Sequence, residues 1–200
     1  CVQHHIPVVG INRPATPPFV DAVCSDNHAG ATLAAAQLHR AGCRRFGWLN
    51  YAYSTWAGRQ RGEAFLQALK MSDISSPVIP LIAQEDGWQG GRLAAQHYAN
   101  AMENIDGVFC ANAQLACGFL EGMRQQGKNA PEDFHLIGFD NTPQTAYDSY
   151  QLTTLHQDVA EISRQALTRL RERADNPLQP AHTSWVDVQL IHRRTSPLSY

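Results

Sequence analysis

Short apolar runs alternate with longer segments whose apolar residues recur at helical spacing, along almost the whole chain. The short runs are bounded by turn residues and predict strands, whereas the longer segments predict helices. Helix ends are marked by residues such as Asp26 before the first helix and Gly42 after it. The pattern predicts strands at residues 6–11, 22–24, 46–49, 78–82, 108–111, 134–139, 152–155 and 185–191, and helices at 29–41, 58–69, 90–102, 114–126 and 159–173.

Strands that alternate with helices form βαβ units, whose strands lie parallel and whose crossovers are right-handed. The predicted fold class is therefore α/β. In open sheets of this class, small ligands bind beyond the carboxyl ends of the strands. Polar and aromatic residues follow five of the predicted strands, at 12–13, 50–53, 85–88, 112 and 140. Such a mixture of amides, carboxylates and aromatic rings is typical of a pocket for a carbohydrate or nucleoside.

Two segments carry the clearest candidate chemistry. The apolar run 137–139 stops on Asp140, and the predicted helix at 58–69 carries Arg59 and Arg61 in its first turn. A strand that ends in a carboxylate and a helix that opens with arginine place opposite charges at the same rim of a parallel sheet. The sequence therefore predicts capture of a polar small molecule.

Composition narrows the class of protein. The chain has 200 residues, of which 44% are hydrophobic and 17% charged, and its formal net charge is −2. This charge argues against a nucleic-acid surface on the chain itself. No apolar run approaches the ~18 residues needed to cross a bilayer. The first residues lack the features of a signal peptide and are typical of a chain cut from something longer. The five scattered cysteines favour a reducing, cytoplasmic location.

Several segments occur in an order and spacing typical of one protein family. They are Ile6-Pro7-Val8-Val9 ending on Asn12, Ser25-Asp26-Asn27, Leu38-His39-Arg40-Ala41-Gly42, Arg61-Gly62-Glu63-Ala64-Phe65, and residues 105–112, 131–141, 152–157 and 190–196. Together they resemble the effector-binding region of LacI/GalR-family transcription regulators, which is itself similar to periplasmic sugar-binding proteins. Each motif alone is weak, and the specificity lies in their number, order and spacing.

The resemblance implies a type I periplasmic-binding-protein-like fold of two doubly wound subdomains that the chain crosses more than once. Residues 1–24 and 155–178 would form a partial N-terminal subdomain, and residues 25–154 and 179–200 the C-terminal one. The family's helix-turn-helix, hinge and first strands are not found in this sequence, so the N-terminal sheet is expected to be incomplete and to expose an edge. An effector would bind in the cleft between the subdomains.

The resemblance also implies ligand-binding residues, each with a structural alternative. Arg61 matches the family's effector-contacting arginine, whose planar fork of donors suits vicinal hydroxyls or a carboxylate. Asp140 matches the family's sugar-hydroxyl acceptor, although Asp before Asn-Thr-Pro would also cap a turn. Arg59 is a weaker second arginine, which could equally be solvated. Trp88 occupies a position where the family often has a stacking aromatic, and could instead be a core residue.

The remaining candidates lie at other strand ends. Asn112 matches a family ligand contact and could equally be a helix N-cap, since Ala113 replaces the usual Asp. Asn12 matches a position often held by Asp, and an amide both donates and accepts where a carboxylate only accepts. Gln157 lies at a predicted crossover, where it could contact ligand or hinge. Tyr51 and Tyr53 are candidate pocket-wall residues.

Three classes of function remain at this point. The first is the effector module of a cytoplasmic, homodimeric regulator that binds a sugar or sugar acid and reaches DNA only through a region missing from this chain. The second is a periplasmic sugar receptor of a transport system. The third, an enzyme, is disfavoured because phosphate-binding loops and a nucleophile elbow are absent from the sequence. The nine histidines lack metal-ligand spacing, so neither a metal nor a cofactor is expected.

Overall fold

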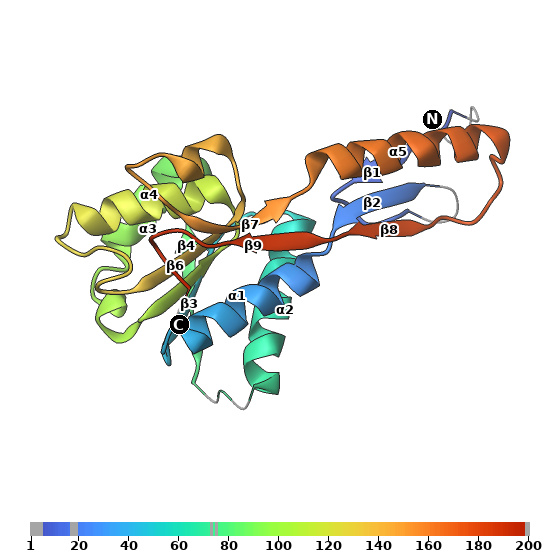
Figure 1. The fold of residues 1–200 in the computed structure, drawn as a ribbon. Coiled ribbons are helices and arrows are strands. Elements are labelled where there is room, and N and C mark those ends of the chain that lie inside the picture. Colours follow the sequence, from blue (N-terminus) through green and yellow to red (C-terminus); the bar gives the residue numbers. More distant parts are fainter. Residues whose placement is uncertain (1–5, 17–19, 73, 75, 199–200) are drawn as a thin grey trace. The chain divides into compact units, whose positions relative to one another are not determined.

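A computed structural model describes residues 6–16, 20–72, 74 and 76–198 of the chain, in which strands and helices alternate (Figure 1). Contacts within the chain divide it into two compact units. Unit 1 comprises the described residues up to Asn27 together with Gln157–Val188. Unit 2 comprises His28–His156 and the described residues from Gln189 onward. Each unit is considered by itself below.

Unit 1 is a three-stranded parallel sheet with one helix lying along it (Figure 1). The strands lie in the order β1 (Val9–Ile11), β2 (Asp21–Ser25) and β8 (Thr183–Val186). Helix α5 (Val159–Asp175) contacts all three strands. Its first turn is capped by Asp158, which accepts a hydrogen bond from the backbone N–H of Glu161 at 2.9 Å. The small core between helix and sheet consists of Val23, Ile162, Ala166 and Val186, with Val9 against them.

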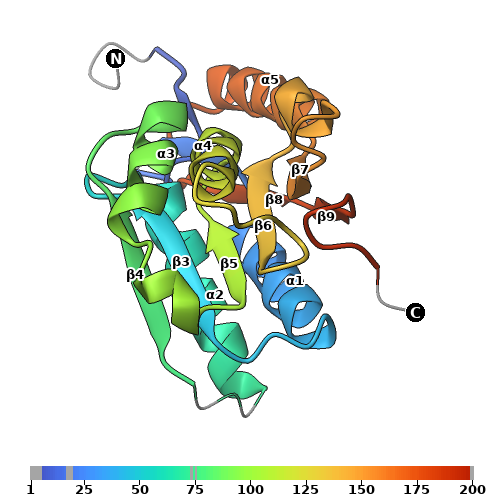
Figure 2. The same ribbon diagram turned by 90° about the vertical axis from the view of Figure 1, so that its left-hand side faces the viewer.

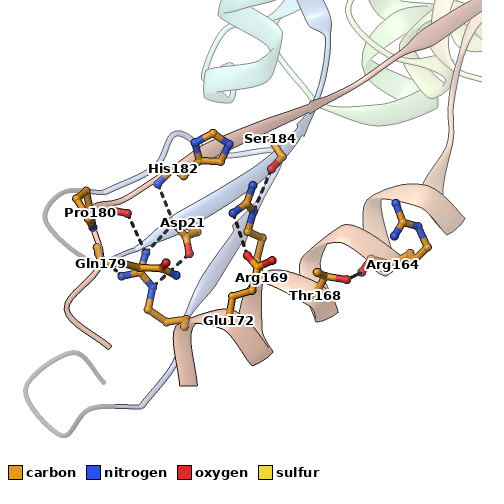
Figure 3. Close-up of polar contacts among 10 residues, drawn as sticks. Asp21, Arg164, Thr168, Arg169, Glu172, Gln179, Pro180, His182 and Ser184 are labelled. Atoms are coloured by element: carbon orange, nitrogen blue, oxygen red, sulfur yellow. Dashed lines mark hydrogen bonds and ion pairs between the residues drawn. The ribbon is translucent and has the colours of Figure 1, made fainter. Parts of the chain in front are cut away.

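A buried ion pair ties the end of α5 to the start of β2. The guanidinium of Arg173 donates to the Asp21 carboxylate at 2.7 Å from Nη2 and 3.2 Å from Nε. The backbone N–H of His182 donates to the same carboxylate at 2.7 Å (Figure 3). The guanidinium also reaches three carbonyl oxygens of the following loop, those of Pro177, Gln179 and Pro180. These contacts fix the loop that leads from α5 into β8.

Unit 2 is built on a six-stranded sheet in the order β4-β3-β5-β6-β7-β9 (Figure 2). Four neighbouring pairs in it, β3–β4, β3–β5, β5–β6 and β6–β7, are parallel. The strands are β3 (Phe46–Tyr51), β4 (Val78–Ala83), β5 (Gly107–Cys110), β6 (His135–Asp140), β7 (Thr153–Gln157) and β9 (Val188–Ile191). The helices are α1 (Asn27–Arg40), α2 (Trp56–Met71), α3 (Gly87–His97) and α4 (Ala113–Arg124), with the short 3-10 helices η2 (Ala101–Asn104) and η3 (Pro143–Ala146).

The direction in which successive strands are added to the sheet reverses at β3. From β3 the chain passes through α2 to β4 on one side, and then through α3 to β5 on the other side of β3. Helices α1 and α2 accordingly cover one face of the sheet, and α3 and α4 the other (Figure 2). The crevice at such a reversal is the usual ligand site of an open α/β sheet. In unit 2 this point lies between the carboxyl ends of β3 and β5.

The two faces of this sheet are packed differently. Below α2, Phe65 contacts Phe46 and Phe109, with ring centroids 6.3 and 5.1 Å apart. On the other face, α3 and α4 approach each other through glycines. A Cβ atom at Gly118 would overlap the carbonyl oxygen of Trp88 in α3. This close approach leaves room only for glycine at that position.

Strand β4 lies at the edge of the sheet. Its backbone N–H at Ile82 donates to the hydroxyl of Tyr98 at 3.1 Å, so this donor faces away from β3. Pro80, two residues earlier on the same side of the strand, has no N–H. Two consecutive outward positions of this edge therefore offer no donor to a further strand.

The prediction of an α/β fold with parallel sheets is confirmed. The single strand expected at residues 185–191 is wrong, because the chain forms β8 and β9, with Asp187 between them, in different sheets. The sequence places residues 179–200 together, but residues up to Val188 lie in unit 1, because β8 pairs with β2. The helix expected at 90–102 ends at His97 and is followed by η2. No helix among the described residues is long and apolar enough to cross a membrane.

Candidate functional site

Arg61 is the most buried of the candidate site residues. Helix α2 begins at Trp56, and its N-cap Thr55 accepts a hydrogen bond from the N–H of Gly58 at 3.1 Å. Arg61 therefore lies in the second turn of the helix rather than in the predicted first turn. Its side chain is 7% exposed and points at the carboxyl ends of the neighbouring strands. Nη1 donates to the carbonyl oxygen of Ala111, immediately after β5, at 2.6 Å.

Asp140 meets Arg61 at the end of β6. One carboxylate oxygen, Oδ1, lies 3.5 Å from Nη1 of Arg61, and the Asp140 side chain is 29% exposed. The Arg61 guanidinium also lies over the ring of Phe139, with Cζ 3.5 Å from the ring centroid. Residues from α2, β5 and β6 thus converge at one rim of the sheet. The sequence predicted this pair of opposite charges, and the structure brings the two side chains together.

The electrostatics of this pair are those of a buried cation with a partly exposed partner. Burial lowers the pKa of Arg61 to about 10, while the carboxylate of Asp140 acts in the opposite direction by stabilising the charged form. The guanidinium therefore stays charged at neutral pH. A forked cation beside an accessible carboxylate can donate to and accept from a polyhydroxylated ligand at the same place.

Asp140 and Asn141 form a turn of unusual backbone geometry. Both residues have positive φ angles, 94° at Asp140 and 51° at Asn141. Residues other than glycine adopt this region rarely, and Asn and Asp tolerate it best. The side chain of Asn141 lies within a network that includes Thr145, His156 and Arg193. Asn141 and Arg193 were not predicted as site residues, although both belong to segments that carry the family resemblance.

Trp88 and Asn112 both have structural contacts in the described fold. Trp88 is half-buried against the core between α3 and α4, and its Nε1 donates to the Tyr150 hydroxyl at 3.0 Å. Asn112 is the N-cap of α4 and accepts a hydrogen bond from the N–H of Leu115 at 2.9 Å. Trp88 is therefore a core residue and Asn112 a helix N-cap, which are the structural roles named as alternatives for them. A ligand contact by either residue stays a prediction.

Tyr51 ends β3, Tyr53 follows it, and Arg59 lies near the start of α2. Arg59 is exposed and donates from Nη1 to the carbonyl oxygen of Ser54 at 2.6 Å. Tyr53 is 81% exposed and contacts Tyr51 edge to face, with centroids 5.6 Å apart. Tyr51 and Arg59 line a hollow of about 560 Å³ between α2 and the β4 edge, together with Trp48, Asn50, Ser54 and Glu63. Neither Arg61 nor Asp140 is among the described residues that line this hollow.

In unit 1, Asn12 and Gln157 form a second polar cluster at strand ends. Nδ2 of Asn12 donates to Oε1 of Gln157 at 3.1 Å, while Oδ1 of Asn12 accepts from the backbone N–H of Ser25 at 2.9 Å. The amide of Asn12 thus donates and accepts at once, which a carboxylate could not do. The buried hydroxyl of Ser25 also donates to Oε1 of Gln157, at 2.6 Å. Ser25 was not predicted, and its place at the end of a strand was the available signal.

The described residues include no group of three or more His, Cys, Asp or Glu side chains that could hold a metal ion. The described cysteines are free and buried, and burial raises the pKa of Cys43 and of Cys117 to about 12. Their thiols are therefore protonated at neutral pH, and so are weak nucleophiles.

Comparison with known proteins gives concordant results. Residues 35–196 match the family model of the periplasmic binding protein-like domain. The HTH-type transcriptional repressor PurR of Klebsiella pneumoniae subsp. pneumoniae is 29% identical over 192 residues, which cover 96% of this chain and 56% of the repressor. The chain therefore spans about half the length of the curated relatives that it matches.

Solved structures agree with the match to the periplasmic binding protein-like domain. A LacI family transcriptional regulator from Enterococcus faecalis V583 with bound ribose is 28% identical, with a TM-score of 0.86, and the match covers 98% of this chain and 71% of that one. A LacI family regulator from Enterococcus faecium with bound ribose is also 28% identical, with a TM-score of 0.84, and the match covers 96% of this chain and 71% of that one.

Proposed function

Because the chain belongs to the family of periplasmic-binding-protein-like domains and is an effector-binding domain of the LacI type, we propose that it binds a small sugar or sugar derivative through Arg61 and Asp140. The observation that carries this proposal is the convergence of the two side chains at the carboxyl-end rim of the unit 2 sheet, where Arg61 reaches the end of β5 and Asp140 ends β6. Ribose in two similar regulators supports the choice of a sugar.

The chemistry of the pair suits a polyhydroxylated ligand. A sugar hydroxyl donates to a carboxylate and accepts from a guanidinium, so Asp140 and Arg61 can bind adjacent hydroxyls. Hydrogen bonds to charged groups contribute about 1.5–3 kcal/mol each, more than those between neutral groups. The carboxylate of a sugar acid would instead bind to Arg61 through the guanidinium fork. Asn112, Trp88 and the Asn12–Gln157 cluster are further candidate contacts.

In the regulator, effector binding would change the affinity for DNA. The size of that change is bounded by the difference in effector affinity between the DNA-binding and released forms. The relatives are HTH-type repressors of which this chain spans 56%, so we infer that another part of such a regulator reads the DNA. A cytoplasmic homodimer completes the proposal, and light scattering on the purified regulator would test the dimer. The curated relatives do not favour the alternative of a transport receptor.

The test is isothermal titration of the 200-residue chain with D-ribose, followed by other pentoses, hexoses and hexuronic acids. Asp140→Asn keeps the size of the side chain and tolerates the positive φ, but removes the charged acceptor. Arg61→Lys keeps the charge but loses the fork. Each is expected to weaken binding about tenfold or more, since one charge-assisted hydrogen bond is lost.

Asp148→Asn is the matched control, because Asp148 is an exposed carboxylate of the same unit. It should leave the affinity unchanged. If none of the sugars binds to the wild-type chain, the proposed ligand class is wrong. If a sugar binds and neither Asp140→Asn nor Arg61→Lys weakens it, the site assignment is wrong.

A further inference from the structure

The turn at Asp140 and Asn141 needs support from outside its own strand. Two successive non-glycine residues with positive φ angles persist only where the surrounding structure determines their conformation. Asp140 carries the carboxylate that faces Arg61. The position of that carboxylate therefore depends on whatever holds the turn.

The side chain of Asn141 is the anchor of this turn. Its Oδ1 accepts a hydrogen bond from Nη2 of Arg193 at 2.8 Å. The Thr145 hydroxyl lies 3.3 Å from the same oxygen and donates to the carbonyl oxygen of Thr142 at 2.6 Å. Because Oδ1 is the acceptor, Nδ2 is the donor to Nδ1 of His156, at 3.0 Å. The backbone N–H of Asn141 donates to the hydroxyl of Thr154 at 3.3 Å. Asn141 is thus held from β7 and from the segment after β9.

Arg193 connects most of these elements through one side chain. Besides Asn141, its guanidinium donates from Nη1 to the carbonyl oxygen of Leu152 at 2.8 Å and to the hydroxyl of Thr145 at 3.1 Å. The three acceptors belong to three different segments of unit 2. They are neutral oxygens of the protein itself, so these donors are directed at the fold rather than at a ligand.

The backbone of Arg193 is itself firmly placed. Its N–H donates to the hydroxyl of Thr153 at 2.9 Å. Two residues later, the buried Thr195 donates to the carbonyl oxygen of Leu136 in β6 at 2.8 Å and accepts from the N–H of Thr153 at 2.9 Å. The segment is therefore joined to both β6 and β7, which makes Arg193 a fixed support for the turn.

We propose that Arg193 is a positioning residue for effector binding: through Asn141 it holds the turn in the conformation that places the Asp140 carboxylate beside Arg61. This inference rests on the proposed function only in taking Arg61 and Asp140 as the effector site. Arg193 acts through another residue and does not contact the effector. The next residue, Arg194, is exposed and provides a matched control.

The first experiment needs no effector. Backbone amide signals of Asp140 and the guanidinium signals of Arg61 are recorded by ¹⁵N NMR on the 200-residue chain. These groups belong to the site pair itself, so their signals report on the geometry of the pair. Arg193→Gln should shift both sets of signals, Arg193→Lys should shift them less, and Arg194→Gln should leave them unchanged. Unshifted Asp140 and Arg61 signals in Arg193→Gln would overturn the proposal.

The second experiment measures affinity for D-ribose by calorimetry. Arg193→Gln should weaken binding about tenfold, within the range known for residues that act through a network. Arg193→Lys should recover most of the affinity, and Arg194→Gln should match the wild type. If ribose fails to bind the wild-type chain, the proposed sugar is wrong, while the NMR result still decides the role of Arg193.

The variant Asn141→Gly provides a second, independent test of whether Arg193 acts through Asn141. Glycine adopts the positive φ readily but cannot link to Arg193. Since Arg193 is proposed to act through Asn141, Arg193→Gln should shift the Asp140 and Arg61 signals much less in the Asn141→Gly background than in the wild type. Equal shifts in both backgrounds would overturn the proposal. This comparison also stands if Arg193→Gln alone lowers the thermal stability, because all spectra are recorded below the unfolding transition.

Discussion

Among the described residues, each unit has a buried arginine paired with an aspartate, and the two pairs are built differently. In unit 1, the side chains of Arg173 and Asp21 are 3% and 1% exposed, with two short contacts between them. In unit 2, the side chain of Arg61 is 7% exposed but that of Asp140 is 29% exposed, and Nη1 lies 3.5 Å from Oδ1. The loop from α5 to β8 hydrogen-bonds to both members of the first pair and shields them from solvent, whereas the second pair leaves the Asp140 carboxylate partly accessible. A fully buried pair can only stabilise the fold, whereas an accessible pair can also bind a ligand.

The largest expected effect comes from breaking the unit 1 pair. Asp21→Asn removes the charge that compensates the buried guanidinium of Arg173, and removing one partner of a buried pair typically costs about 3–5 kcal/mol. We expect a loss of this size in the free energy of unfolding, measured by urea denaturation. A loss below about 1 kcal/mol would show that this pair contributes no more than an exposed one.

The corresponding change in unit 2 should affect binding more than stability. Asp140→Asn should weaken effector binding about ten- to a hundredfold, the cost of one charged hydrogen bond. Because Asp140 is partly exposed and its contact to Arg61 is long, the loss of unfolding free energy should stay below that of Asp21→Asn. Titration calorimetry and urea denaturation of the same preparations test both statements. The comparison fails if Asp140→Asn destabilises the fold as much as Asp21→Asn does.

The unit 2 pair should also show a characteristic pH dependence. The folded-state pKa of Arg61 is lowered from 12.5 to about 10, mainly by burial. The unfolded chain therefore binds more protons between these values, so the contribution of Arg61 to stability is unfavourable below pH 10 and becomes less so as the pH rises. Relative to Arg61→Gln, the wild type should gain on the order of 1 kcal/mol between pH 8 and pH 10.5. A constant difference across this range would contradict the prediction.

The smallest effect is expected for a partly exposed pair in unit 1. Arg169 and Glu172 contact each other at 3.0 Å on the surface of α5, one turn from Arg173 (Figure 3). Exposed pairs of this spacing contribute about 0.3–0.5 kcal/mol. Arg169→Gln should lower the free energy of unfolding by no more than this, apart from its weaker contact to Ser184. A much larger loss would mean that burial does not separate the two kinds of pair.

The site pair could be predicted from local sequence because strand ends and helix starts are local features. Asp140 ends an apolar run, and Arg61 lies near the start of an amphipathic helix, so the α/β topology alone brings them to one rim. The partners of Asn141 and Trp88 could not be predicted in this way. Arg193 and Tyr150 lie 52 and 62 residues away from them, and only the folded sheet brings them into contact.

The prediction of a single last strand was wrong for the same reason, because strand pairing is not a local feature of the sequence. Residues 186–190 alternate between apolar and polar side chains, as a single strand would. The division at Asp187 depends on the strands that pair on either side of it, β2 for one half and β7 for the other. Alternation reports which side chains are buried, but does not report which sheet buries them.

The blocked edge of β4 bears on how copies of this protein can meet. Backbone pairing across an open sheet edge accepts almost any sequence and is the usual first step toward fibrous aggregates. Pro80 and the Tyr98 hydroxyl interrupt the row of donors that such growth requires. Association at this edge therefore has less backbone pairing available and depends more on side-chain complementarity. At this edge, the chain is protected against indiscriminate self-association.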